Sequence, residues 1–194
     1  LDVALLNDRI DLAVHSLKDV PTQLPAELVQ AAVLERGPVN DLLVFKNPST
    51  MEKYISLNEH DSFFTVATSS IRRKAQWLNK YPRHKVENLR GNVNTRLEKV
   101  SQENWDAAIF AQAGLERINL RPISSLVLDW MLPAPAQGAI MAASREDDDF
   151  TLQACQTFNH ASTVRCTKIE RDFLRTLLGG CSTPISALAV EYKD

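Results

Sequence analysis

The feature that most constrains the fold is a run of three strand–loop–helix units between residues 63 and 118. Each unit opens with a short apolar segment, continues into a polar loop and enters a helix with an apolar face. The expected strands are 63–67, 85–89 and 107–111, and the helices after them begin near Ser70, Val93 and Gln112. This alternation predicts an open, mainly parallel α/β sheet with right-handed crossovers. Such sheets bind ligands beyond the carboxyl ends of their strands.

Basic and hydroxyl side chains gather where these three strands end. They are Thr68, Ser70, Arg72 and Arg73 after the first strand, Arg90 and Arg96 after the second, and Arg117 after the third; Gly91 and Asn92 form the turn that follows Arg90. A helix N-terminus carries unpaired N–H groups and a partial positive charge, and an arginine fork can bind a carboxylate through two parallel bonds. The pattern predicts a ligand with several carboxylates or phosphates. For each arginine taken singly, a solvated helix face remains the alternative.

Other segments complete the expected order of elements. We expect strands at 12–14, 27–34, 41–46 and 138–143, a helix that starts at 47–50, another over 152–160, and a connection with two prolines at 129–137. In the helix that starts near Ser70, the spacing places Ile71, Ala75 and Leu78 on the buried face. In the last helix, 162–178, the expected buried stripe is Val164, Ile169, Phe173 and Leu177, with Ser162 or Thr163 as the cap.

The loop His15–Thr22 is dense in reactive groups. It follows the expected strand 12–14 and ends at a proline, and within five positions it carries His15, Ser16, Lys18 and Asp19. A surface turn with one charge pair is the simpler interpretation of this loop taken alone. The density of polar groups instead favours a functional loop at the end of a strand.

Composition excludes several classes of protein. With 44% hydrophobic residues, 24% charged residues and a net charge of -2, the chain is an ordinary globular protein with no general affinity for nucleic acid or anionic membranes. No apolar run approaches the ~20 residues that cross a bilayer. The three cysteines form no CxxC pair, which predicts neither a disulfide framework nor a zinc site and fits a reducing, intracellular setting.

The cysteines differ in their surroundings. Cys155 and Cys166 lie in expected helices and are interpreted as small buried hydrophobes. Cys181 follows Gly179-Gly180, and these glycines both end the last helix and allow close approach of the backbone to another group. Its thiol is therefore expected to be accessible for covalent chemistry.

Five segments together resemble the signature segments of one enzyme family, porphobilinogen deaminase, also called hydroxymethylbilane synthase. They occur in the family's order over nearly the whole chain: His15-Ser16-Leu17-Lys18-Asp19-Val20-Pro21, Thr68-Ser69-Ser70-Ile71-Arg72-Arg73, Leu89 to Leu97, Ala113-Gly114-Leu115-Glu116-Arg117, and Gly179-Gly180-Cys181-Ser182-Thr183-Pro184. The resemblance implies a transferase of tetrapyrrole (heme and porphyrin) biosynthesis. Such an enzyme condenses four porphobilinogen molecules head to tail into hydroxymethylbilane and releases ammonia. It also implies a dipyrromethane cofactor in thioether linkage, with Cys181 as the matching cysteine.

The resemblance also assigns roles to residues. It implies that Asp19 is the catalytic carboxylate and that no metal is needed. The cofactor-binding residues would be Ser16, Lys18, Thr68, Ser70, Arg72, Arg73, Arg90, Gly91, Asn92 and Cys181, and the substrate-binding residues would be Arg90, Arg96, Arg117 and Gln137. One departure concerns Ala136, which stands where the family more often has glycine.

The implied fold has periplasmic-binding-protein-like α/β domains 1 and 2, followed by the start of a small α+β domain 3. We expect residues 1–38 and 133–160 in domain 1, whose N-terminal part is missing, 39–132 in domain 2, and 161–194 in domain 3. The expected protein is a monomer that acts on a small molecule in the cytoplasm, with an organelle as the alternative. Two other functions stay open: a two-lobed binding protein or sensor for a polycarboxylate, and a family member that folds without catalysing.

Overall fold

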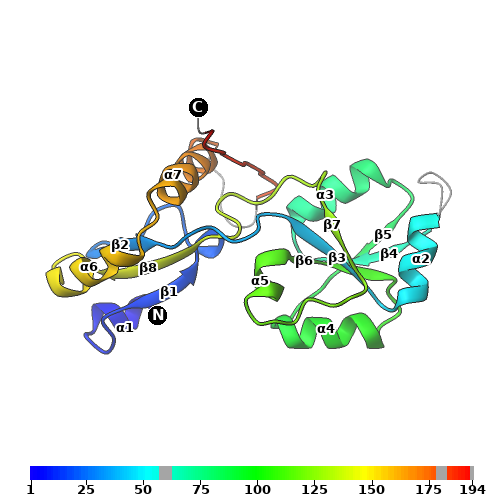
Figure 1. Cartoon of the computed structure of the whole chain (residues 1–194), viewed down its shortest axis with the longest axis horizontal. Coiled ribbons are helices and arrows are strands. Elements are labelled where there is room, and N and C mark those ends of the chain that lie inside the picture. The colour runs from blue at the N-terminus through cyan, green and yellow to red at the C-terminus, as the bar shows by residue number, and fades with distance from the viewer. Residues whose placement is uncertain (57–62, 178–182, 193–194) are drawn as a thin grey trace. The chain divides into compact units, whose positions relative to one another are not determined.

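The structure, a computed structural model, describes residues 1–56, 63–177 and 183–192. It has the mixed α/β class expected from the sequence. The chain divides into two compact units, and each is described by itself (Figure 1). Unit 1 combines Leu1–Gly37 with Pro133–Asp194, and unit 2 is the continuous segment Pro38–Leu132. Residues 161–194 belong to unit 1 in this division, and a separate third domain stays a prediction.

Unit 2 is built on a five-stranded sheet of order β5-β4-β6-β3-β7. The strands are β3 (Asp41–Phe45), β4 (Thr65–Ala67), β5 (Lys85–Glu87), β6 (Ala107–Ala111) and β7 (Ser125–Leu128). β4 is parallel to β5 and β6, whereas β3 is antiparallel to β6 and β7. The expected mainly parallel sheet is therefore wrong for half of its pairings. The strand–helix alternation covers only β4, β5 and β6, and it carries no information on the direction of β3 or on the short strand β7.

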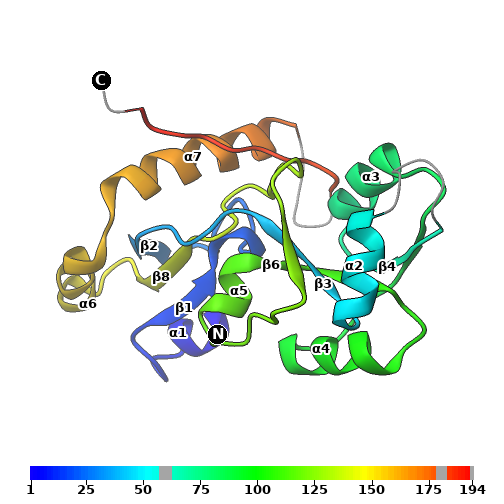
Figure 2. The same ribbon diagram turned by 45° about the vertical axis from the view of Figure 1, so that its right-hand side comes forward.

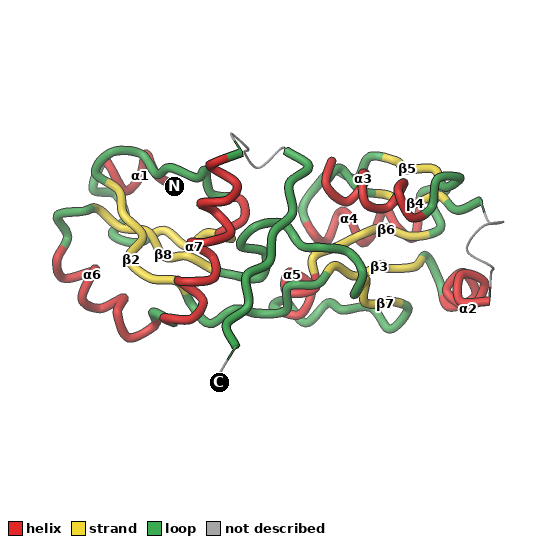
Figure 3. Tube along the Cα trace, turned by 90° about the horizontal axis from the view of Figure 1, so that it is seen from above, coloured by secondary structure: helices red, strands yellow, loops and turns green. Residues whose placement is uncertain are grey.

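Helices cover both faces of this sheet (Figures 1 and 3). They are α2 (Pro48–Ser56), α3 (Ile71–Lys80), α4 (Val93–Gln102) and α5 (Gln112–Glu116). Alternate residues of β3 face opposite ways: Leu43 and Phe45 join the core beneath α2 and α3, and Leu42 and Val44 join the core beneath α4 and α5. A strand buried on both faces is continuously apolar, as this one is after its first residue.

The buried face of α3 differs from the expected one. Ile71 is 54% exposed and Ala75 is also exposed, whereas Arg72, Arg73 and Trp77 are buried. The expected face is wrong for Ile71 and Ala75, because it was drawn from apolar spacing alone, whereas the third expected member, Leu78, is partly buried and packs against the core. A buried acidic partner, described below, allows two arginines to take the inward positions.

Unit 1 contains a three-stranded antiparallel sheet in which β8 (Ile140–Arg145) lies between β1 (Ala13–Ser16) and β2 (Leu28–Val33) (Figure 2). Its helices are α1 (Asp2–Leu6), α6 (Asp149–Cys155) and α7 (Ala161–Thr176), with single 3-10 turns η1 (Leu17–Asp19) and η2 (Gln156–Phe158). Leu5 of α1 and Val164 of α7 pack with Met141 and Ala143 of β8, whereas α6 packs against the alternate residue Ala142. The central strand thus lies more than 100 residues after β2 in the sequence.

Helix α7 turns a mostly polar face inward. Its buried residues are Thr163, Thr167, Glu170 and Leu174, and the expected stripe members Ile169, Phe173 and Leu177 are exposed by 61%, 49% and 52%. The expected stripe is wrong for these three residues because internal bonds satisfy the polar groups, such as the Thr167 hydroxyl, which donates to the Thr163 carbonyl at 2.7 Å. The N-cap is His160, whose Nδ1 accepts from the Thr163 N–H, and the expected Ser162 or Thr163 cap is also wrong.

The structure also shows how deeply two of the cysteines are buried and whether any described helix could span a membrane. Cys155 is buried as expected, Cys166 is partly buried, and Cys181 lies outside the described residues. Among the helices of the described ranges, none has the length and apolar character needed to cross a bilayer.

Candidate functional site

The loops after β4 and β5 are joined by hydrogen bonds at one edge of the sheet in unit 2. β4 lies between β5 and β6 and runs parallel to both, so the carboxyl ends of the three strands share this edge. The Thr68 N–H donates to the Glu87 carbonyl at 2.8 Å. The Ser69 hydroxyl bonds both the carbonyl and the N–H of Leu89, at 2.9 and 3.0 Å. The first two predicted ligand loops are therefore neighbours.

The hydroxyls of the first loop build the start of α3. Ser70 is its N-cap and accepts from the Arg73 N–H at 3.4 Å, while the Ser70 N–H donates to the Thr68 hydroxyl at 3.2 Å. Thr68 is only 3% exposed. These two predicted cofactor-binding residues thus have structural roles in the turn that opens the helix.

Arg72 and Arg73 share one buried carboxylate, that of Asp41. Each donates from Nη2 to a separate Asp41 oxygen at 2.7 Å, and Asp41 is fully buried. The Nη1 groups donate to backbone carbonyls, Arg72 to Leu132 at 2.6 Å and Arg73 to Ile109 at 3.1 Å. This arrangement fixes both guanidinium groups at the first turn of α3 and leaves a net positive charge there.

The electrostatics of this cluster keep Asp41 ionised. Burial alone would raise its pKa, but the charges of Arg73 and Arg72 and their hydrogen bonds outweigh burial and lower the pKa to about 2. Burial also lowers the pKa of Arg72, opposed by the charge of Asp41. Asp41 is therefore ionised at neutral pH.

The second loop is shaped by Gly91 and Asn92. Asn92 caps α4 by accepting from the Thr95 N–H at 2.9 Å. Gly91 has φ +121°, and a side chain there would place its Cβ 2.9 Å from the Thr95 methyl group, so this position favours glycine. Arg96 donates through Nε to the Gly91 carbonyl at 2.6 Å, and Arg90 is exposed. The loop thus places an exposed guanidinium directly before a capped helix N-terminus.

The third loop leads into α5, which ends at the predicted substrate residue Arg117. The Arg117 N–H donates to the Ala113 carbonyl at 3.2 Å. Arg117 is exposed, and incomplete solvation lowers the pKa of its guanidinium.

In unit 1, the predicted catalytic loop is fixed by its backbone and its apolar residues. Leu17 and Val20 are buried, and the Leu17 N–H donates to the Ala139 carbonyl at 3.0 Å. Asp19 and Ser16 are exposed, and Lys18 is partly buried. The chain therefore presents the Asp19 carboxylate to solvent from a short turn at the end of β1.

Gln137, the other predicted substrate residue of unit 1, is 1% exposed. Its carbonyl accepts from Arg36 Nε at 2.9 Å. The residue before it, Ala136, has φ +61°, a left-handed conformation that glycine adopts more easily. A glycine at this position would therefore adopt the observed angle with less strain than the alanine does.

The predicted site residues therefore form two groups, one in each unit. Unit 2 holds Thr68, Ser70, Arg72, Arg73, Arg90, Gly91, Asn92, Arg96 and Arg117, and unit 1 holds Ser16, Lys18, Asp19 and Gln137. Cys181 lies outside the part of the chain that the structure describes. Sequence analysis missed Asp41 as a partner of the arginines. Its signal was a single acid at the start of a buried apolar strand, where an unpaired charge is very costly.

The fold and these loops define a class of protein: a mixed α/β protein with arginine-rich loops at the carboxyl ends of parallel strands. A family described as "Porphobilinogen deaminase, dipyromethane cofactor binding domain" matches residues 1–153. The chain belongs to the porphobilinogen deaminase family, whose members are transferases.

Similar curated proteins agree with this assignment. The chain is 44% identical over 196 residues to the chloroplastic porphobilinogen deaminase of Oryza sativa subsp. japonica. This match covers all of the chain and 53% of the rice protein. It is 44% identical over 192 residues to the probable porphobilinogen deaminase of Methanocaldococcus jannaschii, covering 98% of this chain and 63% of that protein. The chain thus spans about half to just under two thirds of the length of these relatives.

Among solved structures, the VFT2 domain of Bordetella pertussis BvgS matches 92% of this chain and 70% of its own chain, at 16% identity and a TM-score of 0.47.

Proposed function

We propose that the protein in its native length is a hydroxymethylbilane synthase. It joins four porphobilinogen molecules head to tail, releases one ammonia for each molecule added, and holds the growing chain through a dipyrromethane cofactor bound to Cys181 by a thioether. The observation that carries this proposal is the family match over residues 1–153. The arginine loops of unit 2 supply chemistry that suits such a ligand.

The arginines would bind the acidic arms of the pyrrole chain. Each porphobilinogen carries an acetate and a propionate group, so the growing chain is a polyanion that requires several guanidinium partners. Arg72 and Arg73 together carry one more charge than Asp41 neutralises. Arg73 Nε is buried and has no hydrogen-bond partner among the residues that the structure describes.

Arg90, Arg96 and Arg117 would extend the binding surface for substrate. Arg90 is exposed beside the N-terminus of α4, where the partial positive charge of the helix adds to its attraction for an anion. Thr68, Ser70, Gly91 and Asn92 would then act mainly through the geometry of their loops. The hydrogen bonds of Thr68, Ser70 and Asn92 hold the helix starts, and Gly91 supplies a φ of +121°.

Asp19 would assist the condensation itself. Loss of the amine from porphobilinogen leaves an electron-poor intermediate, and attack by the neighbouring pyrrole gives a cationic ring that must lose a proton. A carboxylate close to the ring N–H groups stabilises this positive charge and helps the proton leave. Exposed at the end of β1, Asp19 is accessible to a ligand.

The covalent cofactor has a direct test. The purified protein in its native length should carry an added mass equal to one dipyrromethane after denaturation, and Cys181→Ser should remove this mass. Cys166→Ser, at a partly buried helical cysteine, is the matched control and should keep it. An unmodified wild-type protein that nevertheless binds porphobilinogen without consuming it would instead support a non-catalytic binding protein.

The role of Asp19 has a separate test. Asp19→Ala should lower kcat at least 100-fold while the cofactor mass and the thermal unfolding midpoint stay near wild type, since the side chain is exposed. Asp147→Ala, which removes another exposed carboxylate of unit 1, should leave kcat unchanged. Near-normal turnover by Asp19→Ala would refute the catalytic role.

We further propose that the protein works as a monomer on a small-molecule substrate, without a nucleic-acid or membrane partner. A cytoplasmic location remains our prediction. The rice and pea relatives are named chloroplastic, so an organelle is the alternative. Sedimentation of the purified protein and fluorescence tagging in its native cell would test the two statements.

A further inference from the structure

One arginine of α7, Arg171, holds the backbone of the loop that carries Asp19. Its Nη1 donates to the carbonyls of Leu17 at 3.1 Å and Val20 at 2.9 Å, and its Nη2 donates to the Pro21 carbonyl at 2.5 Å. Three carbonyls from one short loop thus converge on one guanidinium. All of these residues belong to unit 1.

The position of Asp19 depends on this backbone. Among the described residues, no hydrogen bond to the Asp19 side chain is present, so no neighbour fixes the carboxylate directly. At this turn, the Leu17 N–H donates to the Ala139 carbonyl at 3.0 Å and the Val20 N–H donates to the Leu17 carbonyl at 3.3 Å. Pro21 has no N–H to contribute.

We propose that Arg171 is a positioning residue that fixes the Asp19 loop for the condensation reaction. This inference rests on the proposed function in one respect, the catalytic role of Asp19. The planar guanidinium reaches carbonyls on both sides of Asp19 at once, which keeps the loop from changing its backbone angles. A lysine in its place would offer one ammonium and could not span the same carbonyls.

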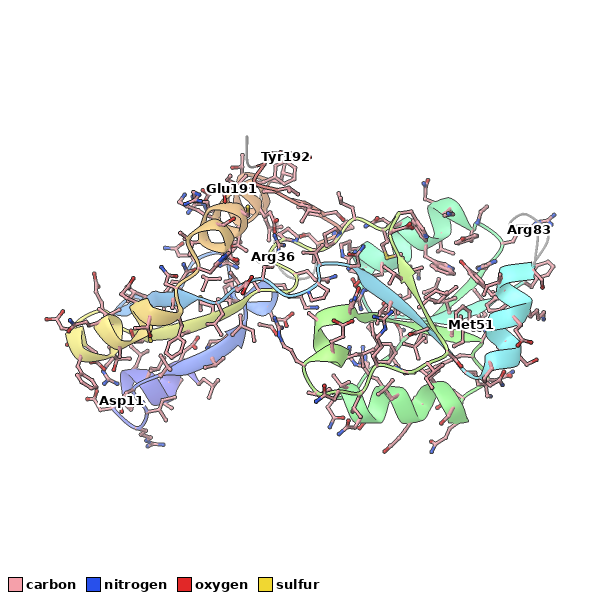
Figure 4. All side chains as sticks on the ribbon, viewed as in Figure 1. Asp11, Arg36, Met51, Arg83, Glu191 and Tyr192 are labelled. Atoms are coloured by element: carbon pink, nitrogen blue, oxygen red, sulfur yellow. The ribbon has the colours of Figure 1, made fainter. Side chains whose placement is uncertain are left out.

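Helix α7, which carries Arg171, is held in place by Glu170, the residue directly before Arg171. Glu170 is 1% exposed and accepts two bonds from Arg36, at 2.7 and 2.9 Å, and one from the Ala136 N–H at 2.6 Å. Figure 4 shows Arg36 on the chain segment beside α7. Because Glu170 anchors the helix, Arg171 has a rigid support from which to hold the loop.

The test compares two arginines of the same helix in the protein of native length. Arg171→Leu should lower kcat about 10- to 100-fold, because a small displacement of a reacting group costs this much in rate. The KM for porphobilinogen should stay within threefold of wild type, and the protein should carry the same cofactor mass as wild type. Arg171→Lys should recover part of the loss. Arg175→Leu removes an exposed arginine that bonds Asp172, and it should leave kcat unchanged.

Hydrogen exchange provides a readout that does not depend on activity. The peptide covering residues 17–20 should exchange at least tenfold faster in Arg171→Leu and at the wild-type rate in Arg175→Leu. Unchanged exchange, or a lower thermal midpoint with normal kcat per folded molecule, would overturn the proposal. If exchange of residues 17–20 rises in Arg171→Leu while the wild-type protein does not turn over porphobilinogen, the proposed function is wrong. The claim that Arg171 holds the backbone of the loop would still stand.

Discussion

At the scale of single residues, the most informative group is Asp41, a carboxylate with no exposed surface between two arginines. Sequence analysis selected Arg72 and Arg73 as anion-binding residues from their place after a strand, but it treated Asp41 only as the first residue of an apolar strand. A buried carboxylate is stable only when it is paired, and here both of its oxygens are bonded. Sequence spacing alone could not identify this pair because the partners lie 31 and 32 positions apart.

The depressed pKa of Asp41 predicts an acid-dependent loss of stability. Since the folded value is about 2 and the ordinary value is 3.8, the group stabilises the fold fully above about pH 4 and loses this contribution as pH falls toward 2. The contribution is about 2 kcal/mol. Urea unfolding between pH 5 and pH 2.5 should show the stability difference between wild type and Asp41→Asn shrinking as the pH falls.

Asp147→Asn, at an exposed turn, is the control for this experiment and should track the wild-type curve. If the difference in free energy of unfolding between Asp41→Asn and wild type is the same at every pH, the lowered pKa of Asp41 does not contribute to stability and the prediction is wrong.

At the scale of helices and strands, sequence patterns located the elements well and their inward faces less well. β2, β3, β6 and the start of α3 agree with expectation to within one or two residues, because apolar runs and a serine cap are local signals. The inward faces of α3 and α7 are wrong because buried ion pairs and internal hydrogen bonds place polar residues where apolar ones were expected. The role of Arg171 in holding the Asp19 loop was missed for the same reason, since it depends on contacts between distant segments.

The buried pair of Glu170 and Arg36 predicts a large effect on the stability of α7. Glu170→Gln keeps the side-chain shape but leaves the Arg36 charge without its partner, at a side-chain exposure of only 12%. We expect the free energy of unfolding to fall by about 3 to 5 kcal/mol in urea titrations. Glu87→Gln, which breaks the exposed pair with Lys85, should cost about 1 kcal/mol or less. Equal small losses for both variants would contradict this ranking.

At the scale of the whole molecule, the two units differ in how the chain builds them. Unit 2 is continuous and has its own core on both faces of its sheet, whereas unit 1 is assembled from two separated segments. The chain passes from one unit to the other near residues 38 and 133, and both positions lie in segments that contain proline. The pairing of β8 between β1 and β2 was not visible, because a short apolar strand carries no mark of its distant partners.

This difference predicts that unit 2 folds alone. Residues 38–132, expressed as a separate chain, should show a cooperative thermal transition and dispersed amide resonances. Residues 1–37 expressed alone should show neither, since β1 and β2 make their sheet bonds to β8 and not to each other. An unfolded 38–132 fragment would show that unit 2 needs contacts from the rest of the chain.

The central place of β8 also has a consequence for synthesis on the ribosome. Strands β1 and β2 cannot pair with β8 until about 100 further residues have been translated after β2, which takes roughly 5 to 20 s at ordinary elongation rates. During that delay, nascent β1 and β2 expose unpaired edges while the following segment can already collapse. Chaperones that shield such edges would therefore act on the segment that carries β1 and β2 before β8 emerges.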